Sequence, residues 1–202
     1  MVYEQTTIFQ TLEDRGNAEE LEKSGPCFCD VCDDNGQLKR GVKEPWLGAG
    51  YYFWDTRIED AHWWGKEVYH KQLKGYVIGK TTYDAHSDAL FDMLGKLSHF
   101  DEFIKVAKLL AGQHGEKRIS FPKVITYLQK NPHFATRYKA IRVCPISEHF
   151  RKSCVYFPHS ATRTPLTMGI IDKVQICFFD RSLLTEPFRI VEHKPYTRGF
   201  TF

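Results

Sequence analysis

The residues with the clearest chemical potential lie in one short stretch, Gly48-Ala49-Gly50-Tyr51-Tyr52-Phe53-Trp54-Asp55. Its glycines allow a tight turn and a close approach of the backbone to a ligand, and the aromatic run after them favours a strand. Thr56 is expected to cap the next helix, whose first turn carries Asp60. This arrangement is expected to bring Tyr52 and Trp63 to one pocket, where two facing rings suit a flat heteroaromatic ligand. The alternative interpretation is that these aromatics simply fill the core.

Two other segments place a neutral amide on a predicted strand. Thr7 to Leu12 is a short β-prone run that contains Gln10, and Asn17 to Gly25 after it is typical of a helix with Asn17 as N-cap. Near the C-terminus, Val174 to Asp180 is an apolar run that contains Gln175. Both amides can donate to and accept from a ligand hydroxyl, or can be ordinary strand residues on a solvated face.

The run from Gly48 to Asp55 resembles the G-x-G-x-Y-F-x-D signature of ADP-ribosyltransferases of the poly(ADP-ribose) polymerase and diphtheria-toxin type. In that family the tyrosine of the motif, here Tyr52, stacks on the nicotinamide of NAD, and a second aromatic, here Trp63, covers the other face. The family's serine that binds the nicotinamide amide falls on Asp60. An acid can accept from the amide NH2 but, when ionised, cannot donate to its carbonyl.

The same resemblance extends to the two amide-bearing strands. Gln10 stands in the place of the family's NAD-binding histidine. Gln175 stands in the place of its catalytic glutamate, as in a set of uncharacterised bacterial and phage transferase-like proteins. A glutamine keeps the hydrogen bond to a ribose hydroxyl but loses the charge that stabilises an oxocarbenium-like state, a loss of about 10²–10³ in rate. The catalytic residues that the resemblance implies are Gln175, Tyr52 and Gln10, and the NAD-binding ones are Gln10, Thr11, Gly50, Tyr52, Asp60 and Trp63.

The resemblance implies an α+β fold, with a split antiparallel β-sheet core, flanking helices and a helical insertion at about 86–130 in a single domain over 1–202. It implies that NAD is a substrate whose ADP-ribose passes to a protein or nucleic-acid acceptor, or to water, as in a mono-ADP-ribosyltransferase or an NAD glycohydrolase. Two alternatives stay open. One is a catalytically degenerate module that binds NAD, ADP-ribose or a protein, and the other is an unrelated α+β protein.

Composition independently indicates an ordered globular protein. Hydrophobic residues make up 42% of the 202 positions and aromatic residues 14%, which is ample for a packed core. The net charge of +3 comes from 28 basic and 25 acidic residues spread along the chain, so no cationic block points to nucleic acid. The N-terminus lacks the basic and apolar regions of a signal peptide, and no long apolar run suits a bilayer. We therefore expect no membrane association and a cytoplasmic location.

Periodicity places the remaining elements. The segment from Gly75 to Asp84 is typical of a strand, whereas apolar residues from Leu90 to Ala111 recur at helical spacing. A further helix is expected over Phe121 to Lys130, with Ser120 as N-cap. The other predicted strands are Tyr138 to Pro145, Ser153 to Phe157, Val174 to Asp180 and Phe188 to Val191.

Three of the six cysteines lie close together as Cys27, Cys29 and Cys32. A structural zinc site needs a fourth ligand, and no second C-x-x-C or H-x-x-x-H pair supplies it. Zinc and a surface loop of reduced thiols both stay open, and no metal ligand is assigned. The other cysteines are expected to be reduced.

Overall fold

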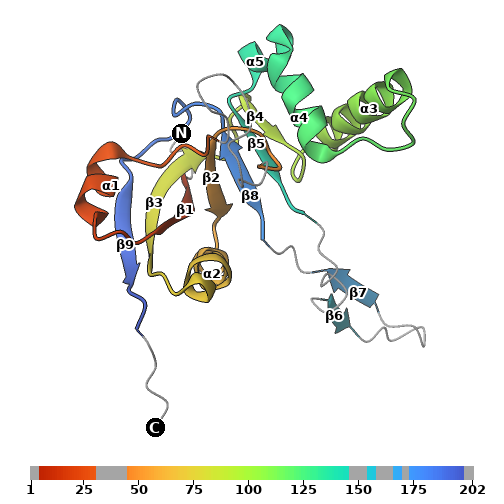
Figure 1. Cartoon of the computed structure of the whole chain (residues 1–202). Coiled ribbons are helices and arrows are strands. Elements are labelled where there is room, and N and C mark those ends of the chain that lie inside the picture. The colour runs from red at the N-terminus through yellow and green to blue at the C-terminus, as the bar shows by residue number, and fades with distance from the viewer. Residues whose placement is uncertain (1–4, 31–44, 146–153, 158–165, 170–172, 198–202) are drawn as a thin grey trace.

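The computed structural model describes residues 5–30, 45–145, 154–157, 166–169 and 173–197. In these residues seven strands form one mixed sheet in the order β4-β5-β8-β2-β1-β3-β9, and β6 and β7 pair separately (Figure 1). The strands are β1 Gln5–Glu13, β2 Tyr51–Asp55, β3 Tyr76–Asp84, β4 Leu90–Asp92, β5 Ala140–Val143, β6 Cys154–Phe157, β7 Leu166–Gly169, β8 Gln175–Phe178 and β9 Arg189–Lys194. The helices are α1 Ala18–Ser24, α2 Ile58–Trp64, α3 Leu97–Gln113, α4 Phe121–Lys130 and α5 Pro132–Arg137.

The backbone pairing between neighbouring strands is shortest at the centre of the sheet, between β1 and β2. β1 and β3 pair along the whole of both strands, from Gln5–Asp84 to Glu13–Tyr76. By contrast, β1 and β2 pair only where Ile8 faces Asp55 and Phe9 faces Trp54. Beyond these pairs the two strands separate, and Cys29 forms a backbone bridge to Gly50 at the start of β2. The central strands therefore leave a gap that side chains must fill.

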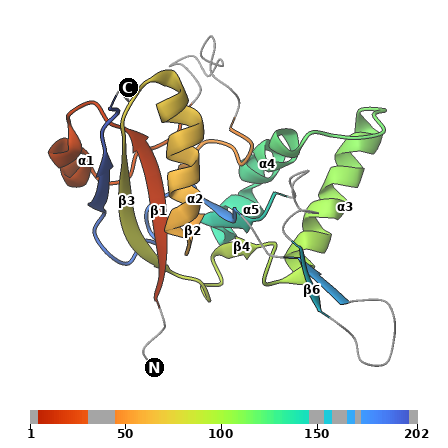
Figure 2. The same cartoon turned by 90° about the horizontal axis from the view of Figure 1, so that it is seen from below.

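Helices cover the two halves of one sheet face. α2 lies against β1 and β2, and α3, α4 and α5 gather at the β4 end of the sheet (Figure 2). Under α2, the buried residues Trp54, Ala61 and Ile78 form one apolar cluster. Under α3 and α4, a larger cluster includes Phe103 and Leu128. The opposite face carries a third cluster, with Ile8, Phe53, Tyr83, Ile176, Phe178 and Phe188 among its buried members.

The expected α+β class is confirmed, and the sheet differs from a purely antiparallel one at a single edge. β4 runs parallel to β5, with Leu90 paired to Ala140. The prediction that Leu90 begins a helix was therefore wrong, because pairing with β5 takes Leu90 to Asp92 into the sheet. A parallel connection requires a crossover, and the helices α3 to α5 supply it. The described elements β7 and α5 were not predicted.

Local capping also differs from expectation at α2. Thr56 has a φ of 60°, its N–H donates to the Thr7 carbonyl, and Arg57 is the N-cap, so the prediction that Thr56 caps this helix was wrong. Asn17 and Ser120 do occupy the N-cap positions of α1 and α4. In the described part of the chain the longest helix, α3, has 17 residues, and none combines the length and apolarity needed to span a bilayer.

Candidate functional site

The three strands that carry the sequence motifs are hydrogen-bonded neighbours, in the order β8-β2-β1. Between β2 and β8, Tyr52 faces Cys177 and Trp54 faces Gln175. Directly paired residues project to the same side of a sheet, and side chains alternate along each strand. Tyr52, Trp54, Gln175 and Cys177 therefore share the face that the helices cover. This places Gln175 diagonally opposite Tyr52.

Tyr52 is tied to the turn that precedes it. Its hydroxyl accepts a hydrogen bond from the Leu47 N–H at 2.9 Å and donates to the Gly48 carbonyl at 2.7 Å. Gly48 has a φ of 79°, a left-handed conformation that favours glycine, and its N–H bonds the Pro45 carbonyl at 3.0 Å. Burial raises the pKa of Tyr52, so the hydroxyl stays protonated. The tyrosine thus holds residues 45–50 over its own strand.

The Gln175 side chain accepts a hydrogen bond from a tryptophan of the turn at 45–50. The indole Nε1 of Trp46 donates to Gln175 Oε1 at 2.6 Å, across 129 positions of sequence. The Trp46 ring also packs at 5.1 Å, between ring centroids, on Phe121 at the start of α4. Sequence reasoning assigned no role to Trp46, and its only signal was its position two residues before Gly48. The turn at 45–50 therefore contacts both residues of the predicted site on this face.

Gln10 projects to the opposite face and fills the gap between β1 and β2. Its register partner on β3 is Gly79, where an added Cβ would meet the Phe188 ring of the other core. Its Nε2 donates to the Cys27 carbonyl at 2.9 Å and to the Tyr52 carbonyl at 3.2 Å, and its Oε1 accepts from the Cys27 N–H at 2.8 Å. Both amide hydrogens are thus engaged by backbone. The structure does not bring the Gln10 side chain to the Tyr52 face.

Trp63 joins a cluster of tryptophans on α2. Its ring centroid lies 6.0 Å from that of Trp54 and 6.2 Å from that of Trp64, and the ring is 39% exposed. The ammonium of Lys173 stands 4.5 Å above the Trp63 ring. Among the described residues no ring contact joins Trp63 to Tyr52, because Trp54 is the residue of β2 that packs against α2. The second aromatic of the predicted site therefore contacts Trp54.

Thr11 and Gly50, two other predicted NAD-binding residues, have structural roles. Thr11 donates through Oγ1 to the Ala61 carbonyl at 2.8 Å, which fastens β1 to α2. An added Cβ at Gly50 would lie 2.5 Å from Cys177 Sγ and 2.6 Å from the Phe178 carbonyl oxygen, so Gly50 lets residues 45–50 approach β8. Asp60 is only 4% exposed, in the first turn of α2.

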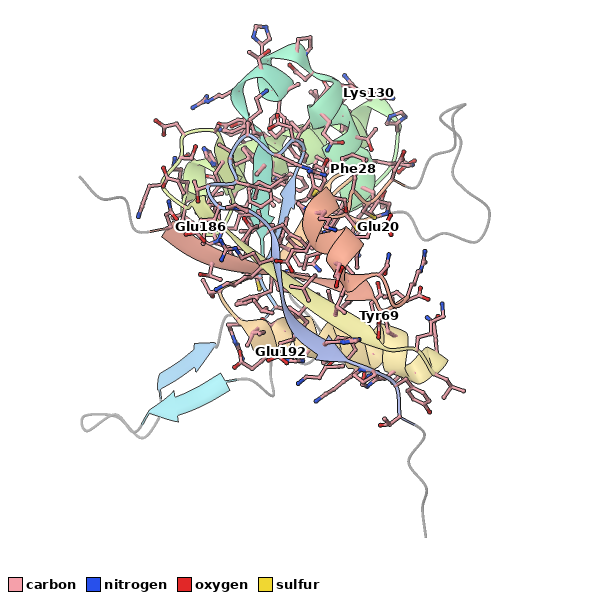
Figure 3. All side chains as sticks on the ribbon, turned by 90° about the vertical axis from the view of Figure 1, so that its left-hand side faces the viewer. Glu20, Phe28, Tyr69, Lys130, Glu186 and Glu192 are labelled. Carbon is pink, nitrogen blue, oxygen red and sulfur yellow. The ribbon has the colours of Figure 1, made fainter. Side chains whose placement is uncertain are left out.

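Tyr52, Gln175 and Cys177 are themselves uncharged side chains. Burial raises the pKa of Cys177 as well as that of Tyr52, and Gln175 does not titrate. Glu192 lies on the edge strand β9, three places from β2, where it pairs with Lys194 at 2.7 Å. Figure 3 shows Glu192 on this edge strand and Glu186 in the segment before it. Glu192 therefore does not replace the carboxylate that is missing at Gln175.

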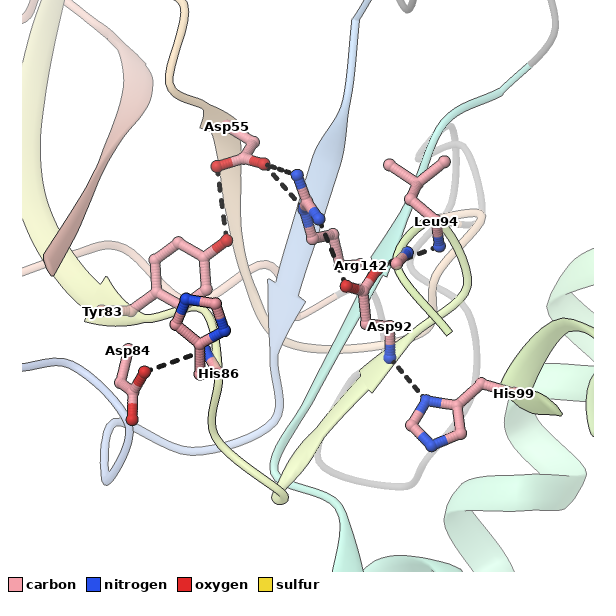
Figure 4. A network of polar contacts seen from close by, with 9 residues as sticks. Asp55, Tyr83, Asp84, His86, Asp92, Leu94, His99 and Arg142 are labelled. Atoms are coloured by element: carbon pink, nitrogen blue, oxygen red, sulfur yellow. Dashed lines mark hydrogen bonds and ion pairs between the residues drawn. The ribbon is translucent and has the colours of Figure 1, made fainter. Parts of the chain in front are cut away.

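A buried polar network that the sequence did not reveal centres on Arg142 and Asp55, on the sheet face opposite Tyr52 (Figure 4). Arg142 of β5 reaches Asp55 Oδ2 at 2.7 Å and Asp92 Oδ2 at 3.2 Å. The Tyr83 hydroxyl donates to Asp55 Oδ1 at 3.4 Å, and the Asp92 N–H donates to His99 Nδ1 at 2.9 Å. The last residue of the glycine-aromatic motif is thus a structural acid.

Two surface depressions lie away from these residues. One lies beside the N-terminus of α1 and includes Asp14, Asn17 and His193. The other lies at the start of β1 and includes Thr7 and Thr56. Neither is lined by a predicted site residue.

The cysteine cluster is described only in part. Cys27 and Cys29 are free thiols, and Cys32 lies outside the described residues. Within the described ranges, no group of three His, Cys, Asp or Glu side chains gathers in a way that could hold a metal ion. Zinc binding by the full cluster stays an open alternative.

No family model, curated protein or solved structure matches this chain.

Proposed function

We propose that this chain is an ADP-ribosyltransferase-like protein that binds NAD on the face of β2 and β8 that carries Tyr52 and Gln175. One observation supports this most strongly. The three strands that carry the motif-like segments, far apart in sequence, are neighbours in the sheet, and two of the three motif residues share a face. A chance match of one glycine-aromatic turn would not require this order.

In this proposal the aromatic side chains hold the nicotinamide end of NAD. Tyr52 offers one ring face, and Trp63, which is 39% exposed on α2, supplies further aromatic surface. Base and aromatic stacking of this kind contributes on the order of 1 kcal/mol per ring. The carboxamide and the ribose hydroxyls would then meet the Gln175 amide.

The proposed reaction is a transfer of ADP-ribose. The bond between the nicotinamide nitrogen and ribose C1′ breaks, nicotinamide leaves with the bonding electron pair, and C1′ forms a bond to an acceptor oxygen or nitrogen that loses its proton. The acceptor is a protein, a nucleic acid or water. Holding the reactants together in the right geometry supplies part of the rate, as in other group-transfer sites.

A second candidate is a module that binds NAD or ADP-ribose without turnover. Gln175 supports it, because this residue carries no charge and its oxygen already accepts from Trp46. Without a negative group beside ribose C1′, the oxocarbenium-like state loses a stabiliser that is typically responsible for about 10²–10³ in rate.

Calorimetry with NAD and an assay of nicotinamide release test both candidates. Tyr52→Ala removes a stacking face, and we expect it to weaken NAD binding by about 1 kcal/mol or more. The matched control is Tyr127→Ala, because Tyr127 is 40% exposed on α4. Nicotinamide release by the wild type, with or without a cell extract as acceptor, supports the transferase. Binding without release supports the module, and equal NAD affinity in wild type and Tyr52→Ala, or none in either, rejects both.

A further inference from the structure

Gln175 stands in a crowded, apolar position at the start of β8. Its register partners are Trp54 on β2 and Val143 on β5, both buried. The Trp46 side chain contacts Gln175, and its ring packs on Phe121. A long amide side chain in such surroundings has few rotamers open to it, so a single strong hydrogen bond can fix its direction.

The hydrogen bond from Trp46 fixes which end of the Gln175 amide is used. An indole N–H is a donor only, so the group 2.6 Å from Trp46 Nε1 must be the amide oxygen. The NH2 group is therefore the end of the amide that points away from Trp46. Among the described residues, Gln175 Nε2 donates no hydrogen bond.

We infer that Trp46 is a positioning residue that turns the Gln175 amide so that the site presents an NH2 donor to its ligand. This inference rests on the proposed function for the identity of that ligand, the nicotinamide riboside end of NAD. The groups that a donor recognises there are acceptors, namely the carboxamide carbonyl and the ribose hydroxyl oxygens. The site then has the opposite polarity to one built on a carboxylate, which only accepts.

Because the NH2 end of the Gln175 amide faces the ligand in this inference, each substitution at Gln175 removes a different set of hydrogen bonds. A glutamate at this position still offers an oxygen to the Trp46 indole, but its other oxygen would face an acceptor of the ligand. Gln175→Glu therefore keeps the contact with Trp46 and loses the donor. Gln175→Met loses both while keeping a side chain of similar length. Trp46→Phe keeps an aromatic ring next to Phe121 and removes the indole N–H together with the rest of the five-membered ring.

The test uses the full chain and two measurements. The first is the proton resonance of the Trp46 indole N–H, without NAD. We expect it to move upfield in Gln175→Met and to stay downfield in Gln175→Glu. The second is NAD affinity by calorimetry. We expect Trp46→Phe to raise the dissociation constant about fivefold to tenfold, the effect of one well-placed hydrogen bond. Gln175→Glu and Gln175→Met should weaken binding at least as much.

Trp64→Phe is the control, because Trp64 is 37% exposed on α2 and its loss removes a different indole N–H. Thermal unfolding of each variant shows that it is folded. Either of two results overturns the inference: an indole resonance unaffected by Gln175→Met, or Gln175→Glu binding NAD as tightly as the wild type. If the wild type binds no NAD, the proposed function fails, and the resonance alone decides whether Trp46 orients Gln175.

Discussion

Arg142 and Asp55 lie 87 positions apart in sequence, yet the guanidinium Nε and Nη2 of Arg142 both lie 2.7 Å from Asp55 Oδ2. The remaining nitrogen, Nη1, reaches Asp92 at 3.2 Å. The side chains of Asp55 and Asp92 are 1% and 9% exposed, so one arginine compensates two buried acids from β2 and β4. This pairing links β2, near the centre of the sheet, to the edge strand β4, which α3 contacts.

Arg142→Met should destabilise the fold strongly, because it leaves two buried carboxylates without a cation. Removing one partner of a buried pair typically costs about 3–5 kcal/mol, and since the Arg142 side chain is 24% exposed we expect about 2–4 kcal/mol. Urea unfolding at neutral pH measures the change. Arg189→Met on the exposed surface of β9 is the control and should shift the free energy of unfolding little. Equal losses in the two variants would contradict the role of the network.

His99 should make stability depend on pH. His99 Nδ1 accepts a hydrogen bond from the Asp92 N–H. Protonation of Nδ1 would therefore break this bond and bring two N–H donors into contact. Burial lowers the pKa of His99 below its usual value near 6.5. The neutral form is therefore favoured by the fold, and its contribution is present above the unfolded pKa and is lost as pH falls through the folded one.

The measurement is the free energy of unfolding between pH 7.5 and pH 5, compared with His99→Phe. The phenylalanine keeps the ring that stacks on Phe91 at 4.7 Å but does not titrate. We expect the wild type to lose more stability than the variant over this range. Parallel pH profiles would show that His99 does not titrate differently in the folded state.

Local signals in the sequence predicted much of the fold. The β-prone run with Gln10, the helix after Asn17 and the strand that begins at Gln175 all lie close to where they were expected. Each of these elements is specified by residues close together in sequence, through helix caps and the spacing of apolar side chains. The specific transferase fold and the NAD site stay predictions.

Long-range pairing explains what local signals missed. Leu90, Met93, Leu94 and Leu97 match a helical stripe, but pairing with β5 places Leu90 in a strand. The Trp46 and Arg142 contacts span 129 and 87 positions, and no short motif records them. The role of Gln10 likewise depends on where the chain returns at Cys27.

Gln10→Met tests whether Gln10 is structural. The substitution keeps the length of a side chain that is 5% exposed and leaves the Cys27 N–H and carbonyl without their partner. Unsatisfied buried groups cost about 1–3 kcal/mol each, so the two Cys27 groups together give an expected loss of about 2–6 kcal/mol in unfolding free energy. Gln72→Met, at an exposed position, is the control. A stable Gln10→Met protein with weakened NAD binding would instead assign Gln10 to the ligand.

Tyr52→Phe separates the two roles of Tyr52, because it removes the hydroxyl and keeps the ring. The Leu47 N–H and the Gly48 carbonyl then lose their partner, and we expect a loss of about 1–2 kcal/mol in unfolding free energy. Because the same turn carries Trp46, the Trp46 indole resonance should also shift. Tyr127→Phe, on the exposed face of α4, should change neither.

The ring and the hydroxyl of Tyr52 should affect NAD binding differently. The phenylalanine variant still offers an aromatic face, so its NAD affinity should fall less than that of Tyr52→Ala. Calorimetry of both variants beside the wild type gives the comparison. If Tyr52→Phe lost as much affinity as Tyr52→Ala, the closed turn rather than the ring would be what the ligand requires, and Trp46 and Leu47 would become the residues to vary next.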